Sequence, residues 1–320
     1  MEAVATAPAA PCARRTGALP RLCPLCGGGE TAVVCRDVQD YEYGAPGTYQ
    51  WLRCTGCGLI RLDPVPTAAI LDQAYPPHYH AYTAPGSAIT RRLLAGSRTR
   101  AARNLARSLP DGACILDVGC STGLLLEAVR RVGRFRLFGV EYKPDAAEQA
   151  RRRGIEVWTG ELENADVPAG SMDLVIMQHV LEHVPAPIET LRRVRAILRP
   201  GGRLVGELPS FDSWDARLFG RYWGGGHAPR HLFHFTPASL TAALQHCGYT
   251  DVRIRPALHT GHWALSIQHL LRRGRTDTAG LASGRSRYYP FMLLLTVPIN
   301  TVQMALRKTG IIRFEARTPA

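Results

Sequence analysis

An alternation of short apolar runs with amphipathic segments, beginning near residue 111, limits the fold of this chain more than any other feature. The run CILDV at 114–118 has the length and composition of a buried strand, and the segment GLLLEAVRRV after it has helical periodicity. Strands that alternate with helices predict a mainly parallel sheet covered by helices on both faces. We therefore expect an α/β fold whose ligand binds beyond the carboxyl ends of the strands.

The alternation continues to the end of the chain and predicts seven strands in all. The other six are expected at 136–141, 155–158, 172–177, 203–209, 251–257 and 311–317. Helices are expected to begin at Pro144 and Pro237, because proline suits the first turn of a helix. The core then spans 111–257, and residues 258–320 carry a helical insertion and the last strand of the core.

The stretch LDVGCSTG joins the first strand to its helix and is the candidate ligand-binding loop. Gly119 and Gly123 bracket a turn whose backbone can approach a ligand closely, although they are also compatible with a turn alone. Glu141 closes the second strand, where a carboxylate can accept hydrogen bonds from both hydroxyls of a ribose. Ser121 breaks the G-x-G-x-x-G pattern of dinucleotide folds, and Asp117 suits a ligand that carries an ammonium group.

Four cysteines form two C-x-x-C pairs, each followed by glycine, and predict a structural metal site. Cys23 and Cys26 form the first pair, and Cys54 and Cys57 form the second. Two such turns separated by a strand-like stretch are typical of a zinc ribbon, here over residues 21–62. Because four protein ligands leave no open position, the expected zinc is structural.

Composition and charge indicate where in the cell the protein is located and which kinds of partner it binds. Residues 1–20 lack the charged and apolar regions of a signal peptide, so we expect a disordered leader and a cytoplasmic protein. Residues 63–110 are expected to form a helical linker or cap. The net charge of +13 comes from scattered arginines without a basic tail, which makes a nucleic-acid partner unlikely.

Four motifs in the core resemble, in order and spacing, those of the class I (Rossmann-like) S-adenosylmethionine-dependent methyltransferases. They are ILDVGCSTG, GVEYKPDA, GSMDLVIMQHVLEHVP and LRPGGRLV, all within residues 111–210. The resemblance implies a Rossmann-like seven-stranded methyltransferase sheet with S-adenosylmethionine as the cofactor. The donor-binding residues that it implies are Asp117, Gly119, Cys120, Gly123, Glu141, Tyr142, Glu161, Leu162 and Gln178. Among these, Glu161 also fits a solvated loop acid. His179 and His183 fit a packing or capping role better than a chemical one, although His179 is kept as a substrate contact.

The ribbon and the tyrosines after it resemble the N-terminal part of bacterial zinc-ribbon methyltransferases, including sugar C-methyltransferases. Tyr75, Tyr79 and Tyr82 have the spacing of one helical face. In that group such tyrosines reach over the donor and acceptor, so Tyr79 and Tyr82 are candidate substrate contacts. A patch that docks the ribbon on the core fits equally well. The sugar C-methyltransferases carry a further domain that we do not expect here, which weakens the sugar assignment.

The stretch HAPRHLFHFTP at 227–237 resembles the segment of the C-methyltransferases that carries a catalytic histidine. The match makes His231 the candidate general base, with Arg230 where an acid is expected and His234 where a tyrosine is expected. An ordinary imidazole titrates near pH 6.5, which suits a base and predicts an acidic-limb pKa of about 6 to 7. A metal at this stretch is disfavoured because no carboxylate or cysteine lies nearby in sequence. His231 and His234 also fit a lid tied down by hydrogen bonds, and this role is favoured for His234, which is kept as a second substrate candidate.

Residues 288–306 form an apolar run that is too short and too interrupted to cross a bilayer. The run suits a lipophilic acceptor, peripheral membrane contact, a dimer face or a plain covering helix.

The function that we expect is methylation of oxygen or carbon in a small or carrier-linked metabolite. Methylation of ribosomal RNA and a non-catalytic zinc-ribbon scaffold are the alternatives.

Overall fold

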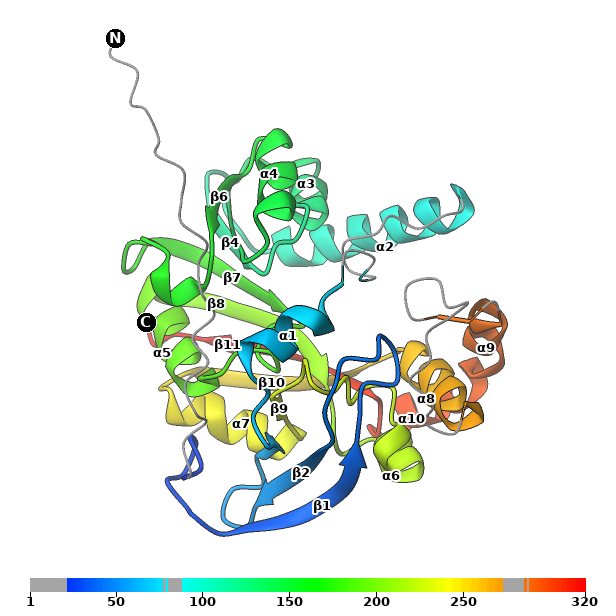
Figure 1. Cartoon of the computed structure of the whole chain (residues 1–320). Coiled ribbons are helices and arrows are strands. Elements are labelled where there is room, and N and C mark those ends of the chain that lie inside the picture. Colours follow the sequence, from blue (N-terminus) through cyan, green and yellow to red (C-terminus); the bar gives the residue numbers. More distant parts are fainter. Residues whose placement is uncertain (1–21, 77–78, 80–87, 273–284, 287) are drawn as a thin grey trace.

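The computed structural model describes residues 22–76, 79, 88–272, 285–286 and 288–320 (Figure 1). The leader expected at 1–20 and the side chain of Tyr82 lie outside the described residues.

A seven-stranded sheet forms the core, with the strand order β10-β11-β8-β7-β4-β5-β6. Strands β6, β5, β4, β7 and β8 pair in parallel, while β11 is antiparallel to both β8 and β10. The strands are β4 (Cys114–Val118), β5 (Arg136–Glu141), β6 (Glu156–Thr159), β7 (Met172–Gln178), β8 (Leu198–Pro209), β10 (Thr250–Ala257) and β11 (Ile311–Arg317). The predicted Rossmann-like sheet is confirmed, and β8 begins five residues earlier than expected from the sequence.

Helices cover both faces of this sheet because successive strand residues point to opposite faces. Ile115 of β4 packs with residues of α2, α3 and α4, whereas its neighbour Leu116 packs with residues of α5 and α7. These helices are α2 (Ala88–Ala106), α3 (Leu124–Arg130), α4 (Pro144–Arg152), α5 (Pro187–Ile197) and α7 (Pro237–His246). Strand β4 is therefore buried on both sides, which explains why it reads as an unbroken apolar run apart from Asp117.

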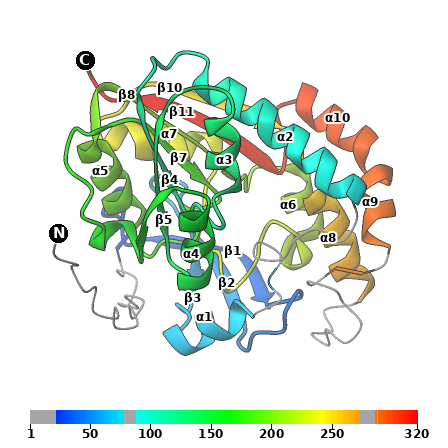
Figure 2. The ribbon, with the colours of Figure 1, turned by 90° about the horizontal axis from the view of Figure 1, so that it is seen from above.

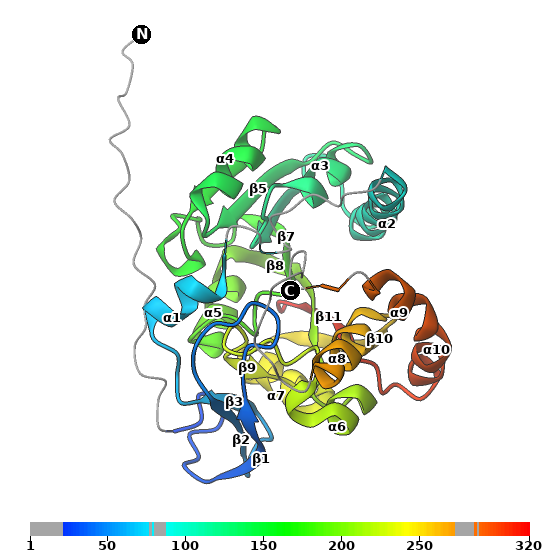
Figure 3. The same ribbon diagram turned by 45° about the vertical axis from the view of Figure 1, so that its right-hand side comes forward.

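A second, four-stranded sheet carries the N-terminal part of the chain (Figure 3). It consists of β1 (Thr31–Val38), β2 (Tyr49–Cys54), β3 (Ile60–Asp63) and β9 (Phe233–His234), in that order. The last strand comes from the HAPRHLFHFTP stretch, with Ile60 opposite His234 in an antiparallel pair. The ribbon strands are therefore joined to the core through a shared sheet.

Helix α1 (Ala68–Ala74) precedes the core and ends earlier than the tyrosine spacing predicts. Thr67 caps its N-terminus, and Tyr75 is its C-cap residue, with φ −116° and ψ 67°. Pro76 follows directly, and the residue before a proline is disfavoured in the helical region. The expectation that Tyr75 and Tyr79 share one helical face is therefore wrong.

The C-terminal helices form a layer at one side of the molecule (Figure 2). They are α6 (Trp214–Phe219), α8 (Gly261–Leu271), α9 (Tyr289–Leu295) and α10 (Val297–Ala305), and short 3-10 turns lie at Leu162–Asn164 and Gly220–Tyr222. Leu293 and Met292 of α9 pack against Ala264 and Leu265 of α8. Among the described helices, none combines the length and the apolar character needed to span a membrane.

Candidate functional site

Two buried carboxyl groups lie where the central strands end. Asp117 of β4 is opposite Gly139 of β5, and Glu141 closes β5 two residues later. Both side chains are buried. The carboxylate of Glu141 accepts hydrogen bonds from the backbone N–H groups of Ser121, at 2.9 Å, and Lys143, at 2.8 Å. Glu141 thus fixes the glycine loop to the end of the second strand.

The electrostatics of this pair favour a ligand with a positive charge. Burial, with a further contribution from Glu141, raises the pKa of Asp117 to about 8. Burial also raises the pKa of Glu141, against the backbone hydrogen bonds that lower it. An ammonium group beside Asp117 would stabilise the ionised form of the carboxyl. Hydroxyl donors would do the same for Glu141.

The two glycines of the loop are both needed for its backbone path. Gly119 has φ +74°, and a Cβ there would lie 2.9 Å from Val180. Gly123 has φ +79°, and a Cβ there would lie 2.5 Å from Ile155. Gly123 therefore serves the packing of the loop on the protein itself, while Gly119 faces the segment after β7. A larger residue at either position would displace the loop.

The other residues expected to bind the donor differ in how accessible their side chains are to a ligand. The Sγ atom of Cys120 lies against Gly139, so a ligand could meet only the backbone of Cys120. Leu162 is buried in the core cluster on one face of the sheet. Tyr142 and Glu161 are half-buried, and Gln178 is exposed at the end of β7.

A histidine and two glutamates form a network at the ends of β7 and β8. His179 Nδ1 lies 3.2 Å from Glu182 Oε1, and His179 Nε2 lies 3.5 Å from Glu207 Oε1. Desolvation lowers the pKa of His179, but these two carboxylates outweigh it and raise the pKa to about 10. His179 has φ 53°, an uncommon value for a residue with a side chain. Its side chain is 40% exposed, so the imidazole is accessible at the sheet edge.

His231 lies beside this network in a buried position. Its Nδ1 is 3.0 Å from the carbonyl oxygen of Gly225, and its Nε2 is 4.0 Å from Glu182 Oε1. Burial, with the neighbouring His183 and other histidines, lowers the pKa of His231 well below its ordinary value. The expected pKa of about 6 to 7 for this residue is therefore wrong. Sequence distance was also a poor guide here, because the fold brings the carboxylate of Glu182 next to His231.

Arg230 joins the segment before β9 to the segment that follows β1. Its guanidinium is fully buried and donates to both carboxylate oxygens of Asp40, at 2.8 and 3.0 Å, and to the carbonyl oxygen of Ala74. Glu42 lies 3.7 Å away and also contacts His227. The segment after β1 thus supplies two acids to Arg230 and His227, whereas the carboxylate near His231 is that of Glu182.

The other two acceptor candidates are packing residues in this structure. Tyr79 is buried, and its ring contacts Tyr43 and Tyr75 at centroid distances of 5.4 and 5.1 Å. The ring of His234 is fully buried beside Trp51 and Trp223. Within the described part of the chain neither ring nitrogen of His234 has a hydrogen-bond partner, so a lid tied down by that side chain is not what the structure shows.

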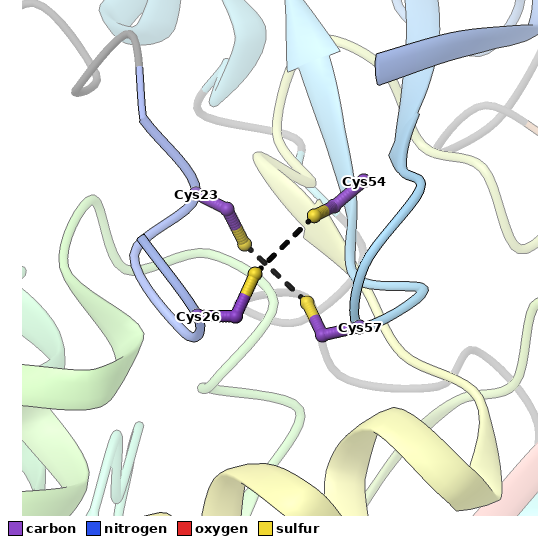
Figure 4. Close-up of side chains that lie close together, drawn as sticks. All are labelled: Cys23, Cys26, Cys54 and Cys57. Atoms are coloured by element: carbon purple, nitrogen blue, oxygen red, sulfur yellow. Dashed lines mark hydrogen bonds between the residues drawn. The ribbon is translucent and has the colours of Figure 1, made fainter. Parts of the chain in front are cut away.

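The four cysteines of the two C-x-x-C turns converge on one point (Figure 4). The Sγ atoms of Cys23 and Cys57 are 3.4 Å apart, as are those of Cys26 and Cys54. A tetrahedral zinc–thiolate site with bonds of about 2.3 Å separates its sulfurs by about 3.8 Å. Gly28, two residues after Cys26, leaves room at the sulfurs, since a Cβ there would lie 3.3 Å from Cys26 Sγ. The donor set and its spacing therefore fit zinc.

Sequence reasoning missed Glu182, Asp40 and Glu42. Glu182 lies in the motif LEHVP, and its near-complete burial is unusual for a glutamate. Asp40 and Glu42 lie in a polar connection between two ribbon strands. A run of acids and aromatics in such a short connection was the available signal, and only the fold shows that it meets Arg230.

A family model described as "Methyltransferase domain" matches residues 89–254, which is more than half of the chain. The chain is 31% identical over 159 residues to a ubiquinone biosynthesis O-methyltransferase of Xanthomonas axonopodis pv. citri, covering 45% of this chain and 65% of that protein. It is 38% identical over 111 residues to an uncharacterized 37.1 kDa protein in transposon TN4556 of Streptomyces fradiae, covering 32% of each. The chain thus spans less than two thirds of the length of these relatives.

Similar solved structures include a protein of Thermotoga maritima described as an S-adenosylmethionine-dependent methyltransferase, possible histamine N-methyltransferase. It has 17% identity and a TM-score of 0.47, covering 72% of this chain and 91% of that one. A methyltransferase from Archaeoglobus fulgidus has 18% identity and a TM-score of 0.47, covering 71% and 94%.

Proposed function

The chain belongs to the methyltransferase-domain family, and from this membership we propose that it transfers a methyl group from S-adenosylmethionine to a small or carrier-linked metabolite. The observation that carries the proposal is the buried pair Asp117 and Glu141 at the carboxyl ends of adjacent parallel strands. Asp117 would bind the ammonium group of the donor, and Glu141 would accept from the ribose hydroxyls. Gly119, Tyr142, Glu161 and Gln178 lie around the same edge of the sheet.

We place the acceptor opposite the donor, over the ends of β7 and β8. Methyl transfer from a sulfonium is an in-line displacement, so the protein mainly aligns donor and acceptor. An acceptor hydroxyl or carbon acid must also lose a proton, and we assign that proton to Nε2 of His231. Its Nδ1 lies 3.0 Å from the carbonyl oxygen of Gly225, which leaves Nε2 with the lone pair. The name of the Xanthomonas relative favours an oxygen acceptor over carbon.

Zinc is proposed for the four-cysteine cluster, where it would be structural. The ion would hold the two turns together at the end of the N-terminal sheet, and that sheet reaches the acceptor side through β9. Because all four positions of a tetrahedral ion would be filled by Cys23, Cys26, Cys54 and Cys57, zinc takes no part in the methyl transfer.

A lipid surface is proposed as a further partner through α9 and α10. Phe291, Leu294 and Leu295 are 66%, 73% and 63% exposed. Val302 of α10 and Leu306, the C-cap residue of that helix, are exposed as well. The sequence has no Asp or Glu from residue 278 to 314, so the apolar surface lies in a basic segment. Exposed apolar side chains with basic neighbours suit the surface of an anionic bilayer.

The test separates the donor side from the acceptor side. Glu141→Ala should weaken donor binding by roughly 1.5–3 kcal/mol, the cost of losing charge-assisted hydrogen bonds, as measured by titration calorimetry. His231→Ala should keep the donor affinity and lower label transfer from S-adenosylmethionine into extract metabolites by roughly 10²-fold or more. Glu148→Ala, on the exposed side of α4, is the control. Wild-type donor affinity in Glu141→Ala, or label that enters only RNA, would overturn the proposal.

A further inference from the structure

One carboxylate and two imidazoles converge on the acceptor side of the sheet, apart from the four cysteines. One ligand atom from each of Glu182, His183 and His231 lies within 4.8 Å of the others. Glu182 and His183 follow β7, whereas His231 precedes β9. The carbonyl oxygen of Glu182 accepts hydrogen bonds from the N–H groups of Leu232, at 2.8 Å, and Phe233, at 3.2 Å. The backbone therefore holds the two segments together at this point.

Hydrogen bonds set both histidines in the same tautomer. His183 Nδ1 lies 3.0 Å from the carbonyl oxygen of Arg230 and also 3.0 Å from the hydroxyl of Tyr75. His231 Nδ1 lies 3.0 Å from the carbonyl oxygen of Gly225. A carbonyl oxygen only accepts, so each Nδ1 carries the proton and each Nε2 keeps its lone pair. Histidines that bind metals are oriented in this way, with the second nitrogen donating to a backbone carbonyl or a carboxylate.

The carboxylate of Glu182 lacks a partner on one side. Its side chain is 1% exposed, and Oε1 lies 3.2 Å from His179 Nδ1. Oε2 is buried and has no hydrogen-bond partner among the described residues. A buried carboxylate oxygen without a partner is costly, and a cation would supply the missing interaction. His179 would then hold the carboxylate from outside, as carboxylate ligands are held in other metal sites.

We propose that Glu182, His183 and His231 bind one divalent transition-metal ion, in addition to the zinc proposed at the cysteines. Two imidazoles and one carboxylate suit Fe²⁺, Co²⁺ or Zn²⁺ better than Mg²⁺ or Ca²⁺, which prefer oxygen ligands. Three protein ligands leave at least one position open. Around such an ion, with bonds of about 2.0–2.1 Å, the ligand atoms lie about 3.4 Å apart. Small side-chain rotations would therefore have to bring the three ligand atoms, now within 4.8 Å of one another, closer together.

The ion would compete with the chemistry assigned to His231. Nε2 has a single lone pair, so it cannot bind an ion and accept a proton at once. This consequence rests on the proposed role of His231 as proton acceptor, whereas the ion site itself does not. We therefore expect the bound ion to lower methyl transfer.

The test is a titration of the zinc-loaded full chain with Co²⁺, followed by native mass spectrometry and visible absorption. The wild type should bind one Co²⁺ beyond the ion at the cysteines, with a ligand-field spectrum and no thiolate charge-transfer band. Glu182→Gln, His183→Ala and His231→Ala should weaken this binding more than about 100-fold, because losing a ligand exceeds the loss of an outer-shell partner. His259→Ala, which removes a histidine of the same region outside the three, should bind Co²⁺ as the wild type does.

Calorimetry with S-adenosylmethionine checks that each variant is folded, because the three residues lie outside the donor loop. Glu182→Gln keeps the size of the side chain, so it still measures the loss of Co²⁺ binding if an alanine variant unfolds. A wild type that takes up no second ion, or folded variants that bind Co²⁺ unchanged, would overturn the site. If Co²⁺ binds and methyl transfer rises, the role of His231 as proton acceptor fails while the ion site stands.

Discussion

The ionisation of Asp117 is strongly altered by its buried position at the end of β4. In the folded chain its pKa is about 8, with burial as the main cause and Glu141 as the second. In an unfolded chain an aspartate titrates near pH 3.9. Between these two pH values the carboxyl of Asp117 keeps its proton in the folded state but has lost it in the unfolded state. The contribution of Asp117 to stability is therefore most favourable at low pH and declines as the pH rises toward 8.

We predict that Asp117→Asn raises the thermal stability of the donor-free chain, and does so more at pH 8 than at pH 5. The neutral amide keeps the shape of the side chain and removes a slope of about 1.4 kcal/mol per pH unit. Melting curves of both proteins between pH 5 and 8 provide the measurement. Asp145→Asn, at an exposed position of α4, is the matched control and should leave the slope unchanged. A difference in Tm that is constant with pH would contradict the assignment.

At the scale of elements, the four cysteines and the N-terminal sheet depend on one another. Cys54 ends β2, and the second turn leads into β3, which pairs with β9 of the core. The turns bury little apolar area of their own, so a bound ion would supply much of their stability.

Cys57→Ser should abolish zinc binding and speed amide exchange in β1, β2 and β3, while donor affinity stays close to that of the wild type. The reason is that the donor loop belongs to the seven-stranded sheet. Metal analysis, hydrogen exchange and calorimetry measure the three effects. Cys35→Ser, in β1 but outside the cluster, should retain zinc. A zinc content unaffected by Cys57→Ser would contradict the four-cysteine site.

The apolar surface of α9 and α10 makes a separate prediction. The double variant Leu294→Ser and Leu295→Ser should reduce co-sedimentation with anionic phospholipid vesicles by at least about tenfold, since burying one leucine contributes roughly 1.5–3 kcal/mol. Leu218→Ser removes a leucine that is 68% exposed on α6 and should have no effect. Equal loss in both variants, or wild-type chain that stays in the supernatant, would exclude the proposed surface.

At the scale of the whole molecule, one buried ion pair joins the N-terminal sheet to the methyltransferase core. Arg230 and Asp40 are separated by 190 residues in sequence and both have side chains at 0% exposure. Tyr43 stacks on the same guanidinium, 5.0 Å from its ring centroid. Removal of the Arg230 charge would leave Asp40 buried without its partner, and removal of the Asp40 charge would leave Arg230 with the more distant Glu42, at 3.7 Å.

We expect Asp40→Asn to lower the free energy of unfolding by about 3–5 kcal/mol, the usual cost of breaking a buried pair. Denaturant unfolding gives the value, and loss of methyl transfer should exceed loss of donor binding because the pair supports the acceptor side. Asp37→Asn breaks an exposed pair with Arg221 and should cost no more than about 1 kcal/mol. Similar costs for the two variants would show that the Arg230 pair does not dock the sheet.

The sequence by itself determined the parallel sheet, the glycine loop and the four-cysteine cluster. Each depends on residues close in the chain: apolar runs set the strands, Gly119 and Gly123 set a local backbone path, and C-x-x-C spacing sets a metal turn. Asp117 and Glu141 could be assigned to one binding site because they end consecutive predicted strands, and the structure pairs these two strands directly.

Only the tertiary structure decided what surrounds His231. Its pKa depends on how deeply the ring is buried, and burial depends on β9 joining a sheet whose other strands lie within residues 31–63. Its contact with Glu182 and the pairing of Arg230 with Asp40 join segments far apart in the chain. Periodicity and spacing report only local geometry, whereas desolvation and ion pairing depend on which distant segments share one interior.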